Sequence, residues 1–87
     1  NMNGVAISAL YDQVLAQQVP LLSIDELDEL LGIEAFKNID SRKATRARML
    51  KKINEYAKST QGKPLITRER SHEDRRQYVY RIAKNSA

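Results

Sequence analysis

A short segment from Ser23 to Gly32 marks both ends of one helix and constrains the fold more than any other part of the chain. Ser23 and Glu26 have the spacing of a capping box, in which each side chain bonds the backbone N–H of the other residue. Gly32 suits the helix end because it adopts the left-handed backbone conformation easily. The predicted helix is about two turns long, and Leu21 and Leu22 before it form either a very short strand or packing contacts. Its acidic side chains are expected to stay in water: Asp25, Glu26, Asp28 and Glu29.

Hydrophobic periodicity and helix-breaking residues predict the elements at the two ends of the chain. Apolar residues at helical spacing predict a first helix over about residues 5–18, which Pro20 ends. After a break at Gly62, residues 65–70 and 76–82 have the pattern of two strands joined by a loop. Two strands alone are only marginally stable in water, so this hairpin must pack on the helices.

A long basic helix is predicted over about residues 41–59, with Asp40 or Ser41 as its N-cap. The connector before it carries Phe36 and Ile39, whose apolar side chains are expected to tuck into the core. The buried stripe of the helix is expected at four positions with helical spacing: Ala47, Leu50, Ile53 and Ala57.

Length and composition suit one α+β domain. The chain has 87 residues, 41% of them hydrophobic, and no cysteine, so packing must hold the core together without disulfides. We expect a single, mostly helical domain over residues 1–87, with its core at about residues 5–83, made of three helices and a C-terminal β-hairpin. No apolar run is long enough to span a membrane, and we expect a cytoplasmic protein.

The sequence offers no recognisable catalytic or metal site. His72 is the only histidine, and its loop has no nucleophile elbow. The three glycines are scattered and form no phosphate-binding loop. We therefore expect a protein that is not an enzyme and that needs no cofactor or metal ion.

Charge is distributed very unevenly along the chain. Residues 1–40 carry one lysine against seven acidic residues, which gives a net charge of −6. Residues 41–87 carry 14 lysines and arginines against four acidic residues, which gives +10. Such asymmetry indicates a polyanionic partner for the basic half. The alternative is that the acidic and basic halves attract each other across the fold.

The order of a capped short helix, a connector and a long basic helix is the logic of a helix-turn-helix, whose second helix fits the major groove of DNA. Candidates for contacts with base edges are Ser41, Thr45 and Arg48. Arg48 suits the two acceptors of a guanine, and Thr45 suits a thymine methyl group. Candidates for phosphate contacts are Arg42, Lys43, Arg46, Lys51 and Lys52. The alternative is a solvated basic face that binds nothing.

The hairpin is expected to act as a wing on the minor groove or the backbone of DNA. Arginine suits a narrow minor groove because the potential there is strongly negative. Along the second strand, Tyr78, Tyr80 and Ile82 alternate and are expected on one face. The candidate wing residues are Arg68, Arg70, Asp74, Arg75 and Arg76. The alternative is a hairpin whose charges pair with each other and protect an edge strand from aggregation.

Taken together, these elements resemble winged-helix regulators, and the MarR family in particular. Ser23–Ile33 (SIDELDELLGI) is similar to the first helix of that family's helix-turn-helix, and Leu65–Ile82 (LITRERSHEDRRQYVYRI) is similar to its wing. The family's Asp-x-Arg wing element matches Asp74-Arg75-Arg76, which implies that Arg76 reaches the minor groove while Asp74 steadies the loop. The resemblance implies a winged helix that binds double-stranded DNA sequence-specifically in a transcriptional regulator, with a homodimer as a second partner.

A second resemblance is to the winged-helix domains of plasmid replication initiators. It lies in Leu27–Ile33 (LDELLGI), in Phe36-Lys37-Asn38 and in Met49–Tyr56 (MLKKINEY). It implies DNA binding in the replication or partition of a plasmid or phage, and with the first resemblance it implies a bacterial nucleoid, plasmid or phage context. An alternative of another class is a protein-interaction winged helix that binds no DNA. RNA binding through the hairpin is a further alternative.

Overall fold

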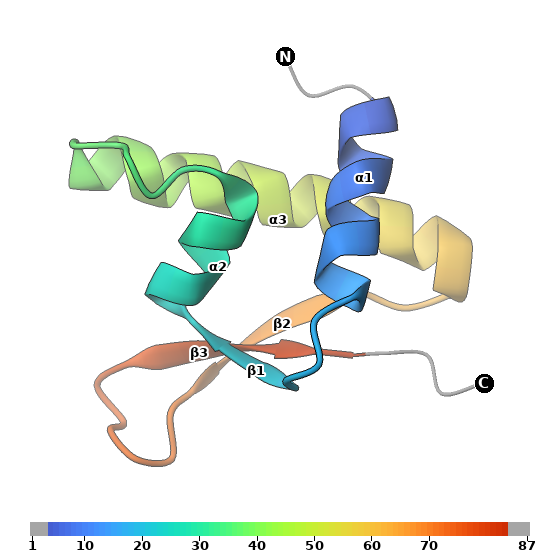
Figure 1. Cartoon of the computed structure of the whole chain (residues 1–87). Helices are drawn as coiled ribbons and strands as arrows, with labels where there is room; N and C mark the ends of the chain where they lie inside the picture. Colours follow the sequence, from blue (N-terminus) through green and yellow to red (C-terminus); the bar gives the residue numbers. More distant parts are fainter. Residues whose placement is uncertain (1–3, 84–87) are drawn as a thin grey trace.

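A computed structural model describes residues 4–83, which form three helices and a three-stranded antiparallel sheet (Figure 1). The elements follow the order α1 (Gly4–Leu15), β1 (Leu21–Ser23), α2 (Ile24–Leu31), α3 (Ile39–Gln61), β2 (Ile66–Arg70) and β3 (Tyr78–Ile82). The expected α+β class is confirmed, with about half of the chain in helices. Among the residues described, no helix combines the length and the apolar character that crossing a membrane requires.

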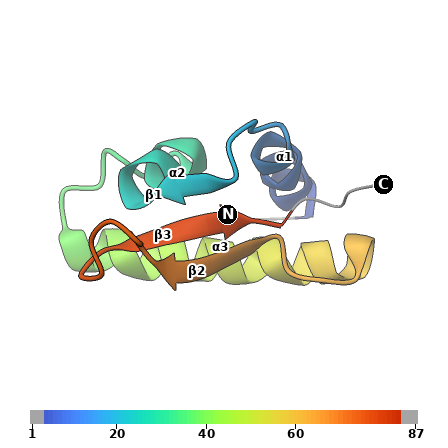
Figure 2. The same cartoon turned by 90° about the horizontal axis from the view of Figure 1, so that it is seen from below.

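Strand β3 lies at the centre of the sheet, between β1 and β2. Tyr80 pairs with Leu22 on one side and with Arg68 on the other. The short strand that was one of two alternatives for Leu21 and Leu22 is therefore present. Figure 2, seen from below, shows α1 and α2 beside β1, whereas α3 lies on the opposite side, along β2.

The predicted ends of α2 are confirmed. The Ser23 Oγ accepts a hydrogen bond from the Glu26 N–H at 3.1 Å, and Glu26 Oε1 accepts one from the Ser23 N–H at 2.8 Å. Gly32 ends the helix with φ 77°, in the left-handed region. No atom lies within 4 Å of the place that a Cβ would take at Gly32, so the backbone angle itself is what favours glycine there.

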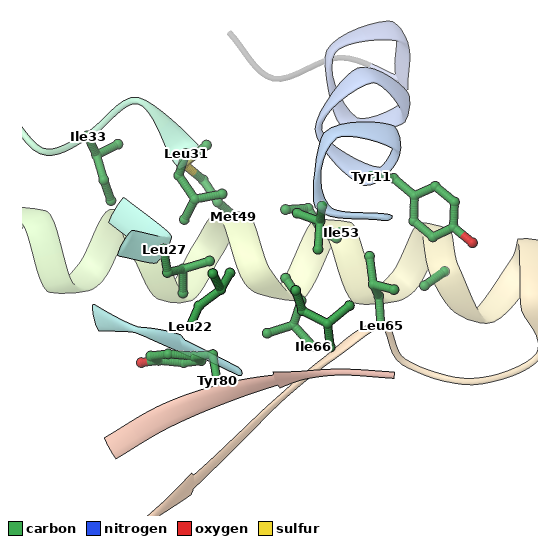
Figure 3. Packing of buried hydrophobic residues seen from close by; sticks show 13 residues of the cluster. Tyr11, Leu22, Leu27, Leu31, Ile33, Met49, Ile53, Leu65, Ile66 and Tyr80 are labelled. Carbon is green, nitrogen blue, oxygen red and sulfur yellow. The ribbon is translucent and has the colours of Figure 1, made fainter. Parts of the chain in front are cut away.

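The core collects side chains from all three helices and from the sheet (Figure 3). Val14 of α1, Leu27 of α2, Ile53 of α3 and Leu65 before β2 are completely buried. The predicted alternation along β3 is confirmed in part, because Tyr80 and Ile82 are buried, whereas Tyr78 at the start of the strand is half-buried. One cluster of buried residues thus connects elements from both ends of the chain.

The predicted core stripe of α3 was partly wrong. Ile53 and Ala57 are buried as expected, but Met49 takes the third buried position, Leu50 is only half-buried and Ala47 is exposed. The reason is tertiary: α1 and α2 cover α3 from the side of Met49, and the hairpin approaches from the side of Ala47 without closing over it. The periodicity therefore predicted the right region of the helix, but the buried face in the structure is turned about the helix axis relative to the predicted one.

The connector between α2 and α3 departs from expectation. Phe36 and Ile39 were expected in the core, but they are 41% and 79% exposed. Ile33, two residues after the end of α2, is buried in the core instead. Phe36 lies farther along the connector, and Ile39 is already the first residue of α3. The N-cap is Asn38, whose side chain accepts from the Ser41 N–H at 3.0 Å, and neither Asp40 nor Ser41 has that role.

Asn54, in the middle of α3, ties the hairpin to the helix. Its Oδ1 accepts hydrogen bonds from the N–H groups of Leu65 and Ile66 at 3.0 and 2.9 Å, and its Nδ2 donates to the Ile66 carbonyl oxygen at 2.9 Å. Because β2 is an edge strand, these groups of Ile66 would otherwise have no strand partner. One side chain therefore fixes the base of the hairpin against α3.

We expect Asn54→Ala to lower the free energy of unfolding by about 2 kcal/mol, because it leaves partly buried backbone groups without partners. Ser59→Ala, on the exposed side of the same helix, is the matched control and is expected to change stability by less than about 0.5 kcal/mol. Urea denaturation of the three proteins measures the difference. Equal stabilities of Asn54→Ala and the parent would contradict the anchoring role.

Candidate nucleic-acid interface

The three candidates for base contacts lie on one exposed side of α3. Ser41 and Arg48 are exposed, and Thr45 between them is half-buried. Arg48 Nη2 donates to Thr45 Oγ1 at 3.2 Å, so the structure brings these two together. This side of α3 does not face the hairpin: Lys43, which does, is about 140° around the helix from Arg48.

A groove separates α3 from the hairpin, and we call it the α3–β2 groove. It has a volume of about 280 Å³. The residues that line it are Lys43, Arg46, Ala47, Leu50, Asn54, Ile66, Arg68 and Tyr80. Two candidates predicted for different elements, Lys43 for α3 and Arg68 for the wing, therefore lie on one feature of the surface.

Two of the five phosphate candidates, Arg42 and Arg46, have a partner inside the molecule. Arg42 Nε donates to Asp28 Oδ2 at 2.8 Å, and Arg46 Nε donates to Asp28 Oδ1 at 2.6 Å. Arg46 Nη2 also donates to Asp28 Oδ2 at 2.7 Å. The side chains of Arg42 and Arg46 are 23% and 13% exposed, and that of Asp28 is 0% exposed. We call these three residues the Asp28 cluster.

The buried position of Asp28 corrects the expectation that this residue stays in water. Burial by itself raises the pKa of Asp28, but the hydrogen bonds and charges of Arg46 and Arg42 more than offset that effect, so the pKa lies below its ordinary value. The hydrogen bond with Asp28, and then the charge of the Asp28 carboxylate, raise the pKa of Arg46 against the effect of burial. The cluster therefore stays fully ionised at neutral pH and links α2 to α3.

We expect Asp28→Asn to lower the free energy of unfolding by about 3 kcal/mol at neutral pH, because it removes one partner of a buried ion cluster. Since the folded-state pKa is lowered, the contribution of Asp28 is complete above its ordinary pKa of 3.8 and is lost as pH falls through the lower folded value. The difference between parent and variant should therefore shrink below about pH 4.

The matched control is Asp25→Asn. The Asp25 side chain is 95% exposed, and its Oδ1 makes a long contact of 3.9 Å with Arg42 Nη2. We expect it to cost less than about 1 kcal/mol. Thermal or urea unfolding from pH 7 down to pH 3 measures both variants. A constant difference between parent and Asp28→Asn across that range would show that the ionised carboxylate is not what stabilises the cluster.

The remaining phosphate candidates, Lys43, Lys51 and Lys52, are exposed on α3. Among residues 4–83, none of these lysines has an acidic side chain within ion-pair distance. The structure thus divides the predicted set into two arginines held by Asp28 and three lysines free to meet solvent or a ligand.

The wing candidates meet in the hairpin. The Arg68 and Arg70 guanidinium carbons lie 4.3 and 4.9 Å from the ring centre of Tyr78, at cation–π distance. Arg70 also donates to the Arg75 carbonyl oxygen at 2.6 Å. Tyr78 and the loop backbone therefore hold these two arginines close together on the face of the hairpin toward α3.

The loop between β2 and β3 is held by Asp74. Its Oδ1 accepts from both the N–H and the Nε of Arg76 at 3.1 Å, and the side-chain bond, followed by the backbone bond, holds the pKa of Asp74 below its ordinary value. Arg76 is therefore paired with Asp74, although its side chain is 90% exposed. Arg75 is exposed as well and has no acidic partner among the described residues.

Part of the charge of the acidic half lies elsewhere, although Asp40 is in the first turn of α3. Glu26 and Glu29 line a hollow together with residues of α1. In Figure 2, α1 and α2 lie on the opposite side of β3 from α3. The alternative that the two halves attract each other is realised at Asp28, with a weaker contact at Asp25. Among the described residues, the exposed lysines of α3 have no acidic partner, and neither do Arg68 and Arg75 of the hairpin, whereas Arg76 pairs with Asp74 and Arg81 with Glu69.

Comparison with family profiles, with curated proteins and with solved structures finds no match to this chain.

Sequence reasoning missed Asn54 and the burial of Asp28. A signal for Asp28 was present, because it shares the helical spacing of Ile24, Leu27 and Leu31 and so lies within the apolar stripe of α2. The signal for Asn54 was weaker: it is a poor helix former in the middle of a long helix. In both cases the partner is distant in the sequence, and spacing alone does not identify it.

Proposed function

We propose that this protein is a winged-helix module that binds double-stranded DNA sequence-specifically. The observation that carries the proposal is the set of exposed cations on α3 and the hairpin. Lys43 and Arg68 line the α3–β2 groove, and Arg48, Lys51 and Lys52 are exposed elsewhere on α3, while Glu26 and Glu29 line a separate hollow. Phosphate contacts dominate the affinity of proteins for DNA, and such a surface is their electrostatic requirement.

The arrangement of elements supports the winged-helix part of this proposal. A short strand, two helices in succession and a hairpin follow α1, and the tip of the hairpin lies on the same side of the molecule as the N-terminal end of α3 (Figure 1). In this arrangement α3 acts as the recognition helix and the β2–β3 hairpin as the wing. The major groove is wide enough to admit a helix such as α3.

The residues have separate roles in this proposal. Arg48 and Thr45 contact base edges, with Ser41 nearer the helix start, while the exposed lysines Lys51 and Lys52 bind phosphates. The arginines of the Asp28 cluster hold α3 in place and contribute positive potential. In the wing, Arg75 and Arg76 approach the minor groove or the backbone.

Duplex binding is expected to weaken linearly on a plot of log affinity against log salt concentration, with a slope of about −0.9 for each phosphate contacted. Arg48→Ala should cost about 1–3 kcal/mol on the preferred site and relax the preference at one base pair. Lys52→Ala should weaken binding to all duplexes about equally and make the slope of log affinity against log salt concentration shallower by about 0.9. Fluorescence anisotropy with duplexes selected from a random pool measures all three quantities.

Glu29→Gln is the matched control for these variants, because it also removes one charge but lies on the acidic side of α2. Its affinity and sequence preference should equal those of the parent. The absence of any duplex binding at low salt would overturn the proposed function and favour the alternative of a protein-interaction winged helix.

A DNA-binding module of this kind suits transcriptional regulation, and the length of α3 is the observation that adds a second candidate role. At 23 residues, after a connector from Gly32 to Asn38, α3 is longer than MarR-type regulators usually show. The replication or partition of a plasmid or phage is therefore the second candidate role beside transcriptional regulation. Recovery of repeated sites of an origin, rather than a promoter operator, from genomic DNA would support it.

A further inference from the structure

The α3–β2 groove has two walls with a positive charge on each. Lys43 stands on the wall formed by α3, and Arg68 stands on the wall formed by β2. Within the described part of the chain, neither cation has an acidic partner. The third cation at the groove, Arg46, is already hydrogen-bonded to Asp28.

Arg68 is held in position, which makes it more than a solvated charge. Its guanidinium carbon lies 4.3 Å from the ring centre of Tyr78. An arginine that stacks on an aromatic ring loses less side-chain freedom when it binds a ligand, since its plane is already oriented. Below it, Asn54 fixes the start of β2 to α3, so the two walls of the groove are joined at one end.

Apolar residues also line the groove. They are Ala47, which is exposed, Leu50, which is half-buried, and Ile66, which is buried like the neighbouring Tyr80. The volume of about 280 Å³ is slightly below the usual range for small-molecule pockets, about 300–1,000 Å³. A groove lined by apolar side chains as well as by a cation on each wall suits an elongated polymer with anionic and apolar parts in alternation.

We propose that the α3–β2 groove seats the sugar-phosphate backbone of one DNA strand, with Lys43 and Arg68 binding phosphates from opposite sides. The deoxyribose carbons lie over Ala47 and Leu50, the apolar lining residues that are exposed or half-buried. This inference rests on the proposed function and deepens it, because it assigns two residues from different elements to neighbouring phosphates of a single strand.

A phosphate-by-phosphate substitution tests this assignment. In a duplex recovered from a random pool, each phosphate is replaced in turn by an uncharged methylphosphonate, and the affinity is measured for the parent, Lys43→Gln and Arg68→Gln. Each variant should lose sensitivity at one phosphate to which the parent is sensitive. The two phosphates should lie on the same strand, adjacent or separated by one nucleotide. Each variant should also have a salt slope shallower by about 0.9.

Lys58→Gln is the matched control, since it removes one charge from the exposed face of α3 near its C-terminus. It should keep the substitution pattern of the parent. Unchanged melting temperatures of Lys43→Gln and Arg68→Gln would show that both fold.

The outcomes separate this inference from the proposed function. If the parent binds duplex but the two phosphates lie on opposite strands, or neither variant loses sensitivity at any phosphate, the groove assignment is overturned while DNA binding stands. If the parent binds no duplex at any salt concentration, both fail.

Discussion

The position of α3 depends on the hydrogen-bonded ion pairs that Arg42 and Arg46 form with the buried carboxylate of Asp28. A buried charge is tolerated only when hydrogen bonds satisfy it, and here Arg42 and Arg46 supply three from successive turns of α3. This directional bonding holds the N-terminal half of the helix against α2. Farther along, the ring of Tyr56 packs edge-on against Tyr11 of α1, with ring centres 5.1 Å apart. The long helix is thus attached to both of the shorter ones.

Once Asp28 holds α3 in place, the other cations of the helix are not needed for ion pairs with α2. The arginines nearest α2 pair with Asp28, and the lysines on the other sides of α3 remain exposed. The hairpin repeats this division, because Arg81 pairs with Glu69 and Arg76 with Asp74, whereas Arg68 and Arg75 have no acidic partner among the described residues. Some basic residues therefore have an acidic partner inside the molecule and others have none, a division that net charge alone does not reveal.

Local signals in the sequence predicted what local chemistry determines. The capping box at Ser23, the stop at Gly32 and the alternation that buries Tyr80 and Ile82 follow from spacing and backbone preference. The burial of Asp28, the exposure of Ile39 and the contacts of Asn54 depend on partners far along the chain, which no local pattern supplies. For the candidate site, the sequence predicted which basic residues belong to α3 and which to the hairpin. Which cations are already occupied, and that Lys43 and Arg68 share one groove, required the tertiary arrangement.

The central claim is that α3 and the hairpin act together as one DNA-binding surface. It is tested most directly by following backbone amide resonances of the isotope-labelled protein while duplex DNA is added. The account predicts the largest shifts in the N-terminal half of α3 and in the hairpin from Arg68 to Arg76, with little change along α1. Shifts confined to the acidic side of α1 and α2, or to the hairpin without α3, would contradict it.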